Sequence, residues 1–431
     1  MPKRKKLLKK LVIIGGGFGG LYAAKKMGHE EFEITLVDKT NHHLFQPLLY
    51  QVATAALSPA DIGTPIRKII SHQENTLVLM SRVTKIDKVN REIHLHNHLP
   101  IPYDYLIVAT GVRHSYFGHD EWEKYAPGLK TLNDALTIRD KLLFNFEKAE
   151  LCDRYSDAEK YLSFIVVGGG PTGVELAGAV AEIANHTMIR NFKRIDPTRT
   201  KIYLVEAAEN LLPSMPKRMG NRARKDLEHL GVEVITGKAV TDINSNGVQV
   251  GDRFIKATNT IWAAGTEASS LLKTLDVPLD KVGRVIVEPD LSIPGYPEVF
   301  VIGDAAHVKG TDGVPLPAVA PVAMQEAVYV TKLIKNKQIG KPHKRFSYID
   351  LGTMATIGRS RAVAQIRGLY FSGIVAWAIW SVVHLMHVIL YRNRLKVLGD
   401  WVLGYITGHR GARLIRNPSE EDFREELNRD K

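Results

Sequence analysis

Two glycine clusters in the sequence have the spacing that binds a pyrophosphate. The letters GGGFGG stand at residues 15–20 and GGGPTG at residues 168–173, so the pattern G-x-G-x-x-G occurs twice. Each cluster follows a short apolar run and precedes a helical pattern, which allows a tight turn and a close approach of the backbone to the phosphates. The helix N-terminus that follows favours negative charge. Each cluster therefore predicts a dinucleotide-binding site.

A carboxylate follows each cluster at the end of the next apolar run. Asp38 ends EITLVD, and Glu206 ends KIYLVE. An acid at this place accepts hydrogen bonds from the hydroxyls of the adenosine ribose. Glu206 is followed by Ala207 and Ala208 instead of an Arg that would bind a 2′-phosphate. The second site is therefore predicted to prefer NADH over NADPH.

Three more side chains have positions that suit a flavin and a nicotinamide. Glu175 lies in the first turn of the second helix, where it either contacts the nicotinamide carboxamide or simply stabilises the helix dipole. Asp304 follows Gly303 at the end of an apolar run, at the sheet edge where ligands bind, and its expected partner is a flavin hydroxyl. Gln325 opens a later helix within possible reach of the isoalloxazine ring; an ordinary helical residue is the alternative.

These side chains need parallel sheets to position them. YLIVATG at 105–111 has a counterpart in TIWAAG at 260–265, so the chain contains two similar units of alternating apolar runs and helical patterns. This order predicts an α/β fold with two Rossmann-like domains. The apolar run at 299–304 lies beyond the second unit, which predicts that the second domain is inserted in the first.

The predicted domain boundaries follow from this insertion. The first domain takes residues 1–150 and 289–345, the second takes 151–288, and a C-terminal region takes 346–431. Linkers are expected near 115–160 and 285–298, the latter rich in Pro.

The single cysteine, Cys152, removes several classes of protein. It excludes an intramolecular disulfide framework, a Cys-based zinc site and a redox-active cysteine pair. No metal site is predicted, and a reducing intracellular setting fits best.

The C-terminal region combines apolar and basic residues. The segment 371–391 contains no Asp, Glu, Lys or Arg and is followed by Arg392, Arg394 and Lys396, in a chain with a net charge of +12. Such a run is long enough to span a bilayer. Polar and aromatic residues at helical spacing favour instead a helix that lies on the membrane, and a buried dimer helix is a third possibility. Deletion beyond about residue 368 is expected to release the protein from membranes.

Two histidines in this segment, His384 and His387, are possible proton donors or contacts for a quinone, because histidine titrates in the useful range. The alternative is that both lie on the wetter face of an interfacial helix.

The combination of motifs resembles type II NADH:quinone oxidoreductases, the single-subunit, non-proton-pumping NADH dehydrogenases among the glutathione-reductase-like two-dinucleotide flavoproteins. The segments that carry the resemblance are GGGFGG (15–20), HHLFQPLLYQVATAALSPADI (42–62), ATG (109–111), GGGPTGVELAG (168–178), GD (303–304) and APVAMQ (320–325). Many members of this family have a motif with two glutamines, the first at the position of Pro321. Only the second, Gln325, is present in this chain.

The resemblance implies FAD on the first unit, NADH on the second, and a quinone at the opposite flavin face near Gln325 and the C-terminal segment. The residues expected at FAD are Gly15, Gly17, Phe18, Gly19, Gly20, Asp38, Lys39, Val83, Ala109, Thr110, Gly111, Gly303, Asp304, Ala323 and Gln325. Those expected at NADH are Gly168, Gly170, Pro171, Thr172, Gly173, Glu175, Glu206, Ala264 and Gly265. The catalytic set is Glu175, Gln325 and His387.

The expected partners are a membrane quinone and an anionic lipid surface, with a possible homodimer and no nucleic acid. The protein is expected on the cytoplasmic face of the cell membrane as a peripheral protein. Hydride transfer from nicotinamide to flavin N5 needs stacking and positioning but no side-chain base, which agrees with the absence of an obvious catalytic triad.

Three other classes of function are alternatives to an NADH:quinone oxidoreductase. Sulfide:quinone oxidoreductases and disulfide reductases need a cysteine pair, so the single Cys152 excludes them. A reductase of ferredoxin or rubredoxin stays open, although it would not need the apolar C-terminal segment. A flavin-bound redox signalling module also stays open.

Overall fold

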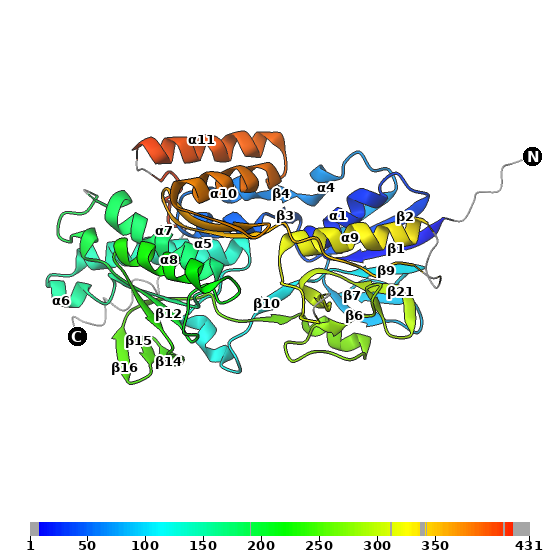
Figure 1. Ribbon diagram of the computed structural model, residues 1–431, viewed down its shortest axis with the longest axis horizontal. Helices are drawn as coiled ribbons and strands as arrows, with labels where there is room; N and C mark the ends of the chain where they lie inside the picture. The colour runs from blue at the N-terminus through cyan, green and yellow to red at the C-terminus, as the bar shows by residue number, and fades with distance from the viewer. Residues whose placement is uncertain are drawn as a thin grey trace, which may run out of the picture. The chain divides into compact units, whose positions relative to one another are not determined.

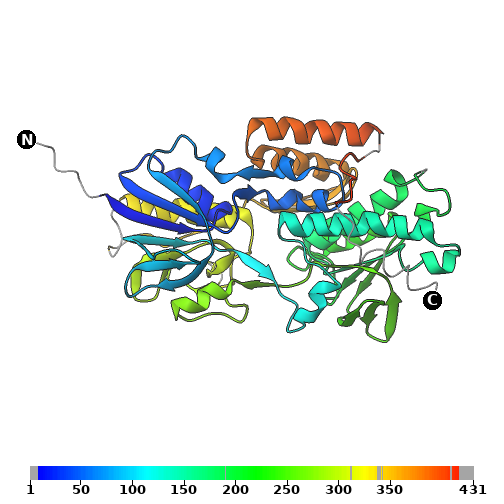
Figure 2. The same ribbon diagram turned by 180° about the vertical axis from the view of Figure 1, so that it is seen from behind.

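A computed structural model describes residues 8–189, 191–310, 313–336, 341, 343–407 and 410–416. The chain forms two compact units, drawn in Figures 1 and 2. Unit 1 contains Met1–Leu44, Gly63–Arg113 and Thr266–Leu351, and unit 2 contains Phe45–Ile62, His114–Gly265 and Gly352–Lys431. The basic start of the chain lies mostly outside the described residues.

Unit 1 is built on a six-stranded sheet with the order β20-β21-β9-β1-β2-β5. All neighbours are parallel except β20 and β21, which pair antiparallel. The strands are β1 (Lys9–Ile14), β2 (Phe32–Asp38), β5 (Thr76–Met80), β9 (Tyr105–Val108), β20 (Ser292–Ile293) and β21 (Tyr296–Val301). Helices α1 (Phe18–Met27) and α9 (Ala320–Lys335) pack against each other, as Figure 1 shows in blue and yellow. The central strand β1 is buried on both faces, which is why it reads as an uninterrupted apolar run.

Shorter elements complete unit 1. They are β3 (His42–Leu44), β4 (Gly63–Pro65), α4 (Ile66–Ile69), β6 (Val83–Asp87), β7 (Glu92–Leu95), β8 (Ile101–Pro102), a 3₁₀ helix at Ser270–Leu275, β19 (Val285–Ile286), a 3₁₀ turn at Gly303–Ala305 and β22 (Ala306–His307). Two more short strands lie where the chain passes from one unit to the other. They are β10 (Val112–His114) and β18 (Thr266–Ala268).

Unit 2 repeats the parallel arrangement with a four-stranded sheet of order β13-β12-β11-β17. Its strands are β11 (Ser163–Val167), β12 (Lys201–Glu206), β13 (Val232–Thr236) and β17 (Asn259–Trp262), and the helices that pack against them are α5 (Leu132–Leu151), α7 (Pro171–Glu182) and α8 (Lys217–His229). β11 pairs with β12 and β17 as β1 pairs with β2 and β9, so the internal repeat read in the sequence is a structural repeat. The parallel strands and the helices that follow them confirm the α/β class.

The remaining elements of unit 2 that precede its C-terminal region are short. They are a 3₁₀ helix at Gln46–Leu48, α2 (Leu49–Ala53), α3 (Pro59–Ile62), a 3₁₀ helix at Asp120–Lys124, α6 (Tyr155–Ala158), a π-helical turn at Ile183–Thr187, a 3₁₀ turn at Pro197–Arg199, and the antiparallel strands β14 (Val240–Asn244), β15 (Gly247–Val250) and β16 (Arg253–Lys256).

The linker expected near 115–160 is wrong, because residues 132–151 of this stretch form the helix α5. Its N-terminus is a capping box: Thr131 accepts from the Asp134 amide, and the Asp134 side chain accepts from the Thr131 amide. The apolar residues of α5 are spaced to bury one face, including Ile138, Leu142 and Phe146. The charged residues between them hid this pattern in the sequence.

The C-terminal region begins with an antiparallel sheet, β23 (Thr353–Gly358), β24 (Arg361–Ile366) and β25 (Leu369–Ser372). Two helices follow, α10 (Gly373–His387) and α11 (Tyr391–Thr407). They separate at Leu390, whose φ of 70° breaks the helical path. The apolar run 371–391 is thus part strand and part helix, and among the described residues there is no helix whose length and apolar character suffice to cross a bilayer.

Candidate active site

The first glycine loop joins β1 to α1 and is shaped for a pyrophosphate. Gly15 has a φ of +103°, and a Cβ there would lie 2.3 Å from the Ala109 carbonyl oxygen. A Cβ on Gly20 would lie 1.8 Å from the Gly15 oxygen, so strand and helix meet too closely for any side chain. At Gly17, by contrast, a Cβ would meet nothing within 4 Å, and no side chain caps the helix there. The amides of the first turn of α1 are therefore available to an anion.

Asp38 holds this loop in place from the end of β2. Its carboxylate accepts hydrogen bonds from the amides of Gly16 and Thr40, both at 2.6 Å. The Thr40 hydroxyl donates to the same oxygen as the Thr40 amide, Oδ1, so it is Oδ2 that keeps a lone pair for a ribose hydroxyl. Asp38 therefore both shapes the loop and suits the adenosine end of a dinucleotide.

The other residues expected at FAD belong to unit 1. Phe18 and Gly19 are on α1, Ala109, Thr110 and Gly111 follow β9, Val83 begins β6, Gly303 and Asp304 follow β21, Ala323 and Gln325 are on α9, and Lys39 is exposed after β2. The Thr110 hydroxyl is buried without a hydrogen-bond partner in the described part of the chain. A buried hydroxyl of this kind needs a partner, which a flavin would supply. These residues fit FAD.

The second glycine loop, between β11 and α7, is built in the same way. Gly168 has a φ of +111°, and a Cβ on Gly173 would lie 1.8 Å from the Gly168 oxygen. Gly170 is open, with Pro171 as the first residue of α7 and no side-chain cap. Glu206 accepts hydrogen bonds from the amides of Gly169 and Ala208, as Asp38 does in unit 1. Thr172 on α7, and Ala264 and Gly265 after β17, complete the set expected at NADH.

Glu175 lies at a pocket within unit 2, two residues after this second loop. The pocket is lined by α2, by one face of α7, by β23 and by α10 and α11. The Glu175 carboxylate has only a long contact, 3.4 Å, from the Thr356 amide. Desolvation by burial raises the pKa of Glu175 to about 8, and hydrogen bonds from Thr356 and Trp380 oppose the rise. Glu175 is therefore largely protonated at neutral pH.

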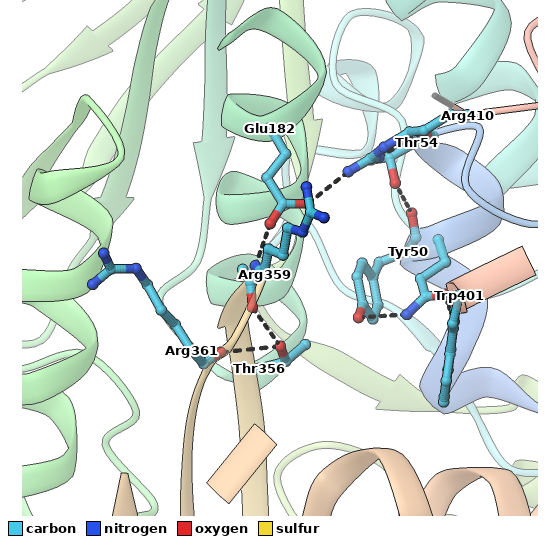
Figure 3. Close-up of polar contacts among 10 residues, drawn as sticks. Tyr50, Thr54, Glu182, Thr356, Arg359, Arg361, Trp401 and Arg410 are labelled. Carbon is cyan, nitrogen blue, oxygen red and sulfur yellow. Dashed lines mark hydrogen bonds and ion pairs between the residues drawn. The ribbon is translucent and has the colours of Figure 1, made fainter. Parts of the chain in front are cut away.

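The far end of the pocket carries charge. Glu182, on the same face of α7, pairs with Arg410 at 2.8 Å and accepts a hydrogen bond from the Arg359 amide (Figure 3). Burial lowers the pKa of Arg410, and the charge on Glu182 opposes this effect. The ionisable side chains that line the pocket besides the tyrosines and Glu175 are Glu182, His186, Arg359, Asp400 and Arg410.

Gln325 and Glu326 follow one another on α9 and have different environments. The Gln325 amide exchanges two hydrogen bonds with the backbone of Ile349, at 2.9 and 3.0 Å. Glu326 is fully buried and accepts a hydrogen bond from the Gly303 amide at 2.5 Å. Burial raises the pKa of Glu326 to about 8.

Comparison with known proteins agrees with this geometry. The family model described as pyridine nucleotide-disulphide oxidoreductase matches residues 9–327, and the model described as NDH2 C-terminal domain matches residues 351–410. The type II NADH:quinone oxidoreductase Ndh of Mycobacterium tuberculosis is 45% identical over 425 residues, covering 94% of this chain and 90% of that protein. The NdhA protein of the same organism is 42% identical, with 94% and 89% covered.

The chain belongs to the type II NADH:quinone oxidoreductases.

Solved structures share the fold at low sequence identity. NDH2 from Plasmodium falciparum in complex with NADH has a TM-score of 0.87 at 21% identity and covers 95% of this chain and 100% of that one. The sulfide:quinone oxidoreductase of Aquifex aeolicus has a TM-score of 0.73 at 18% identity, covering 95% and 96%. The single Cys152 separates the present chain from cysteine-pair chemistry on this fold.

The two histidines have unequal places in this oxidoreductase. His384 bonds to the Trp380 carbonyl and stacks on the Trp380 ring at 4.3 Å. Burial lowers the pKa of His384 to about 4, so it is neutral at physiological pH and is not charged for proton donation. His387 is exposed at the end of α10, where its Nδ1 lies 2.8 Å from the Val383 carbonyl oxygen. Its expected catalytic role stays a prediction.

Several residues at the pocket were missed by sequence reasoning. Tyr50 and Gln51 fall inside the segment 42–62 that carried the family resemblance, but no role was assigned to them. Trp401 and Arg410 reach the pocket from the C-terminal region, and their contacts with α2 cross about 350 residues of sequence. No local pattern marks such contacts.

Proposed function

We propose that this chain oxidises NADH on unit 2, passes the hydride to FAD on unit 1, and then delivers two electrons to a membrane quinone without pumping protons. The observation that carries the proposal is the pair of uncapped glycine-loop helices, each with a carboxylate that holds its loop. FAD, when bound, supplies the hydride acceptor and electron donor. The proposed catalytic set is Glu175, Gln325 and His387, and the proposed domain division is the one predicted from the sequence.

The residues of the chain bind and orient the reactants instead of acting as a base. Gly17 and Gly170 open the two helix N-termini to pyrophosphates, and Asp38 and Glu206 suit the ribose hydroxyls. A protonated Glu175 can donate to the nicotinamide carboxamide oxygen or accept from its amino group, because a neutral carboxyl has both functions. Positioning of this kind is what hydride transfer needs.

Anaerobic mixing with NADH tests the first half of this proposal. The flavin absorbance is expected to bleach with NADH and to recover when a short-chain quinone is added. Bleaching without recovery would move the acceptor to a protein such as a ferredoxin.

We further propose that α10 and α11 rest on an anionic lipid surface at the cytoplasmic face of the cell membrane. Leu395, Leu398, Val402 and Ile406 form an exposed apolar stripe along α11, and they are 42% to 75% exposed. Exposed apolar side chains at helical spacing beside basic ones are typical of interfacial helices. Part of the basic cluster serves the fold instead, because Lys396 pairs with the buried Asp61 at 2.6 Å.

Deletion beyond residue 368 is a poor test of this membrane contact. It would remove Ala376, which is buried against the C-terminal sheet, and the buried Trp380. Substitution of Leu398, Val402 and Ile406 by Ser alters only the exposed stripe. Co-flotation with vesicles containing anionic lipid is expected for the wild type and not for the triple variant, and equal flotation would refute this anchor. A possible homodimer remains part of the proposal, to be checked by mass in solution.

A further inference from the structure

A directional chain of hydrogen bonds leads from the C-terminal helix α11 to the pocket of Glu175. The indole Nε1 of Trp401 donates to Oε1 of Gln51 at 2.7 Å. The amide Nε2 of Gln51 then donates to the Tyr50 hydroxyl oxygen at 2.9 Å. Figure 3 shows the Trp401 ring beside the side chain that bonds to Tyr50. Tyr50 and Gln51 are 6% and 8% exposed, so water does not compete for these groups.

The chemistry of the three groups fixes the direction of this chain. An indole N–H can only donate, so it must face the oxygen of the Gln51 amide. The amide nitrogen is thereby turned toward Tyr50 and donates to its oxygen. Because the Tyr50 oxygen is already an acceptor, its own proton is left to donate elsewhere. Trp401 thus decides the role of the Tyr50 hydroxyl.

The pocket that Tyr50 borders is also the pocket of Glu175. Tyr50 and Glu175 line the same pocket, and the charge on Glu175 adds to the effect of burial in raising the pKa of Tyr50. Trp380 and Trp401 line the same pocket, and their rings pack together with centroids 5.5 Å apart.

The backbone of α2 is held independently of the hydrogen bonds from Trp401 through Gln51 to Tyr50. Arg410 donates to the Thr54 carbonyl at 2.7 Å while it pairs with Glu182, and the Thr54 hydroxyl donates to the Tyr50 carbonyl (Figure 3). Loss of the Trp401 donor should therefore free the Gln51 amide to rotate without releasing the helix.

We propose that Trp401 and Gln51 are positioning residues for the NADH reaction: they direct the Tyr50 hydroxyl toward Glu175, so that α11 completes the nicotinamide end of the NADH site. This inference rests on the proposed function, and specifically on Glu175 contacting the nicotinamide. It assigns α11 a role in NADH oxidation in addition to its proposed contact with lipid.

The test compares Trp401→Phe, Tyr50→Phe and the double variant in the FAD-loaded enzyme. Each single variant is expected to slow the saturated rate of flavin bleaching by NADH about three- to tenfold, the value of one hydrogen bond, and to leave reoxidation by a short-chain quinone unchanged. The double variant should be no slower than Tyr50→Phe, because both substitutions remove the same directed proton.

Thr407→Val is the matched control. It removes a hydroxyl from the same helix, but that hydroxyl bonds to the Leu403 carbonyl at 2.8 Å, and the exposed Thr407 does not line the pocket. Its bleaching rate should equal that of the wild type. Flavin content and Tm measured for every variant identify any that misfold.

Two outcomes would overturn the inference. One is a folded Trp401→Phe protein that bleaches at the wild-type rate; the other is single-variant effects that multiply in the double variant. Absence of bleaching in the wild type would instead refute the proposed function itself, so the two failures are distinguishable.

Discussion

Glu326 in unit 1 and Glu175 in unit 2 both have a pKa raised to about 8 by burial, yet their surroundings differ. Glu326 is sealed in the core and makes a 2.5 Å bond with the Gly303 amide. Glu175 borders a pocket and has only a 3.4 Å contact with the Thr356 amide. One carboxyl is committed to the fold, whereas the other is free to meet a ligand. A raised pKa alone therefore does not identify a functional acid; its hydrogen-bond partners and its access to a pocket do.

The largest expected effect is the loss of stability on Glu326→Ala. The Gly303 amide would lose its partner and a cavity would form, which should lower the free energy of unfolding by about 3 kcal/mol. Glu175→Ala should change it by less than about 1 kcal/mol, since no short bond is lost. Chemical denaturation of both variants checks the comparison. Equal losses would show that the two acids serve the fold alike.

The second prediction concerns stability and pH. The folded protein keeps the Glu326 proton up to about pH 8, whereas the unfolded chain releases it near the ordinary glutamate pKa of 4.5. The unfolded state then binds fewer protons, so the free energy of unfolding falls as pH rises from about 5 to 8. Glu326→Gln removes this dependence. The stability of the variant should therefore rise relative to that of the wild type by roughly 3.5 kcal/mol over that range, because each pH unit between the two pKa values changes the free energy of unfolding by about 1.36 kcal/mol. A pH-independent difference would contradict it.

The third prediction distinguishes Glu175 from Glu326 by the effect of its substitution on the rate of flavin bleaching by NADH. Glu175→Ala should slow flavin bleaching by NADH about tenfold, or about 1.4 kcal/mol, through loss of a contact with the nicotinamide. Glu175→Gln, a neutral mimic of the protonated acid, should stay near the wild-type rate at pH 7. Above about pH 8 the wild-type carboxyl ionises and the wild type should slow while the Gln variant does not. Parallel pH profiles would remove the proposed role.

The smallest expected effect is on coenzyme choice. Glu206→Gln retains an acceptor for one of the two amides that the carboxylate holds, but it removes the negative charge that opposes a 2′-phosphate. The ratio of kcat/KM for NADH to that for NADPH should fall several-fold, with flavin content unchanged. Asp38→Asn is the counterpart in unit 1, where the expected loss is of bound FAD at an unchanged coenzyme ratio.

The two units also differ in what their sequence made predictable. Both glycine loops, their acids and the parallel strands could be predicted because each depends on neighbours close in sequence. α5 was missed although Thr131 and Asp134 form a capping box, because its buried face is diluted by charged residues. Glu326 looked like any polar residue of a helix, and only the fold brings Gly303 to it. The bond from Trp401 to Gln51 joins segments far apart in the chain, so tertiary packing alone creates that part of the pocket.

The most direct test of the account is the absorbance of the purified protein on anaerobic mixing with NADH, followed by a short-chain quinone. We expect a yellow protein whose flavin absorbance bleaches with NADH and recovers rapidly with quinone. A protein that carries no flavin, or a bound flavin that NADH fails to reduce, would contradict it.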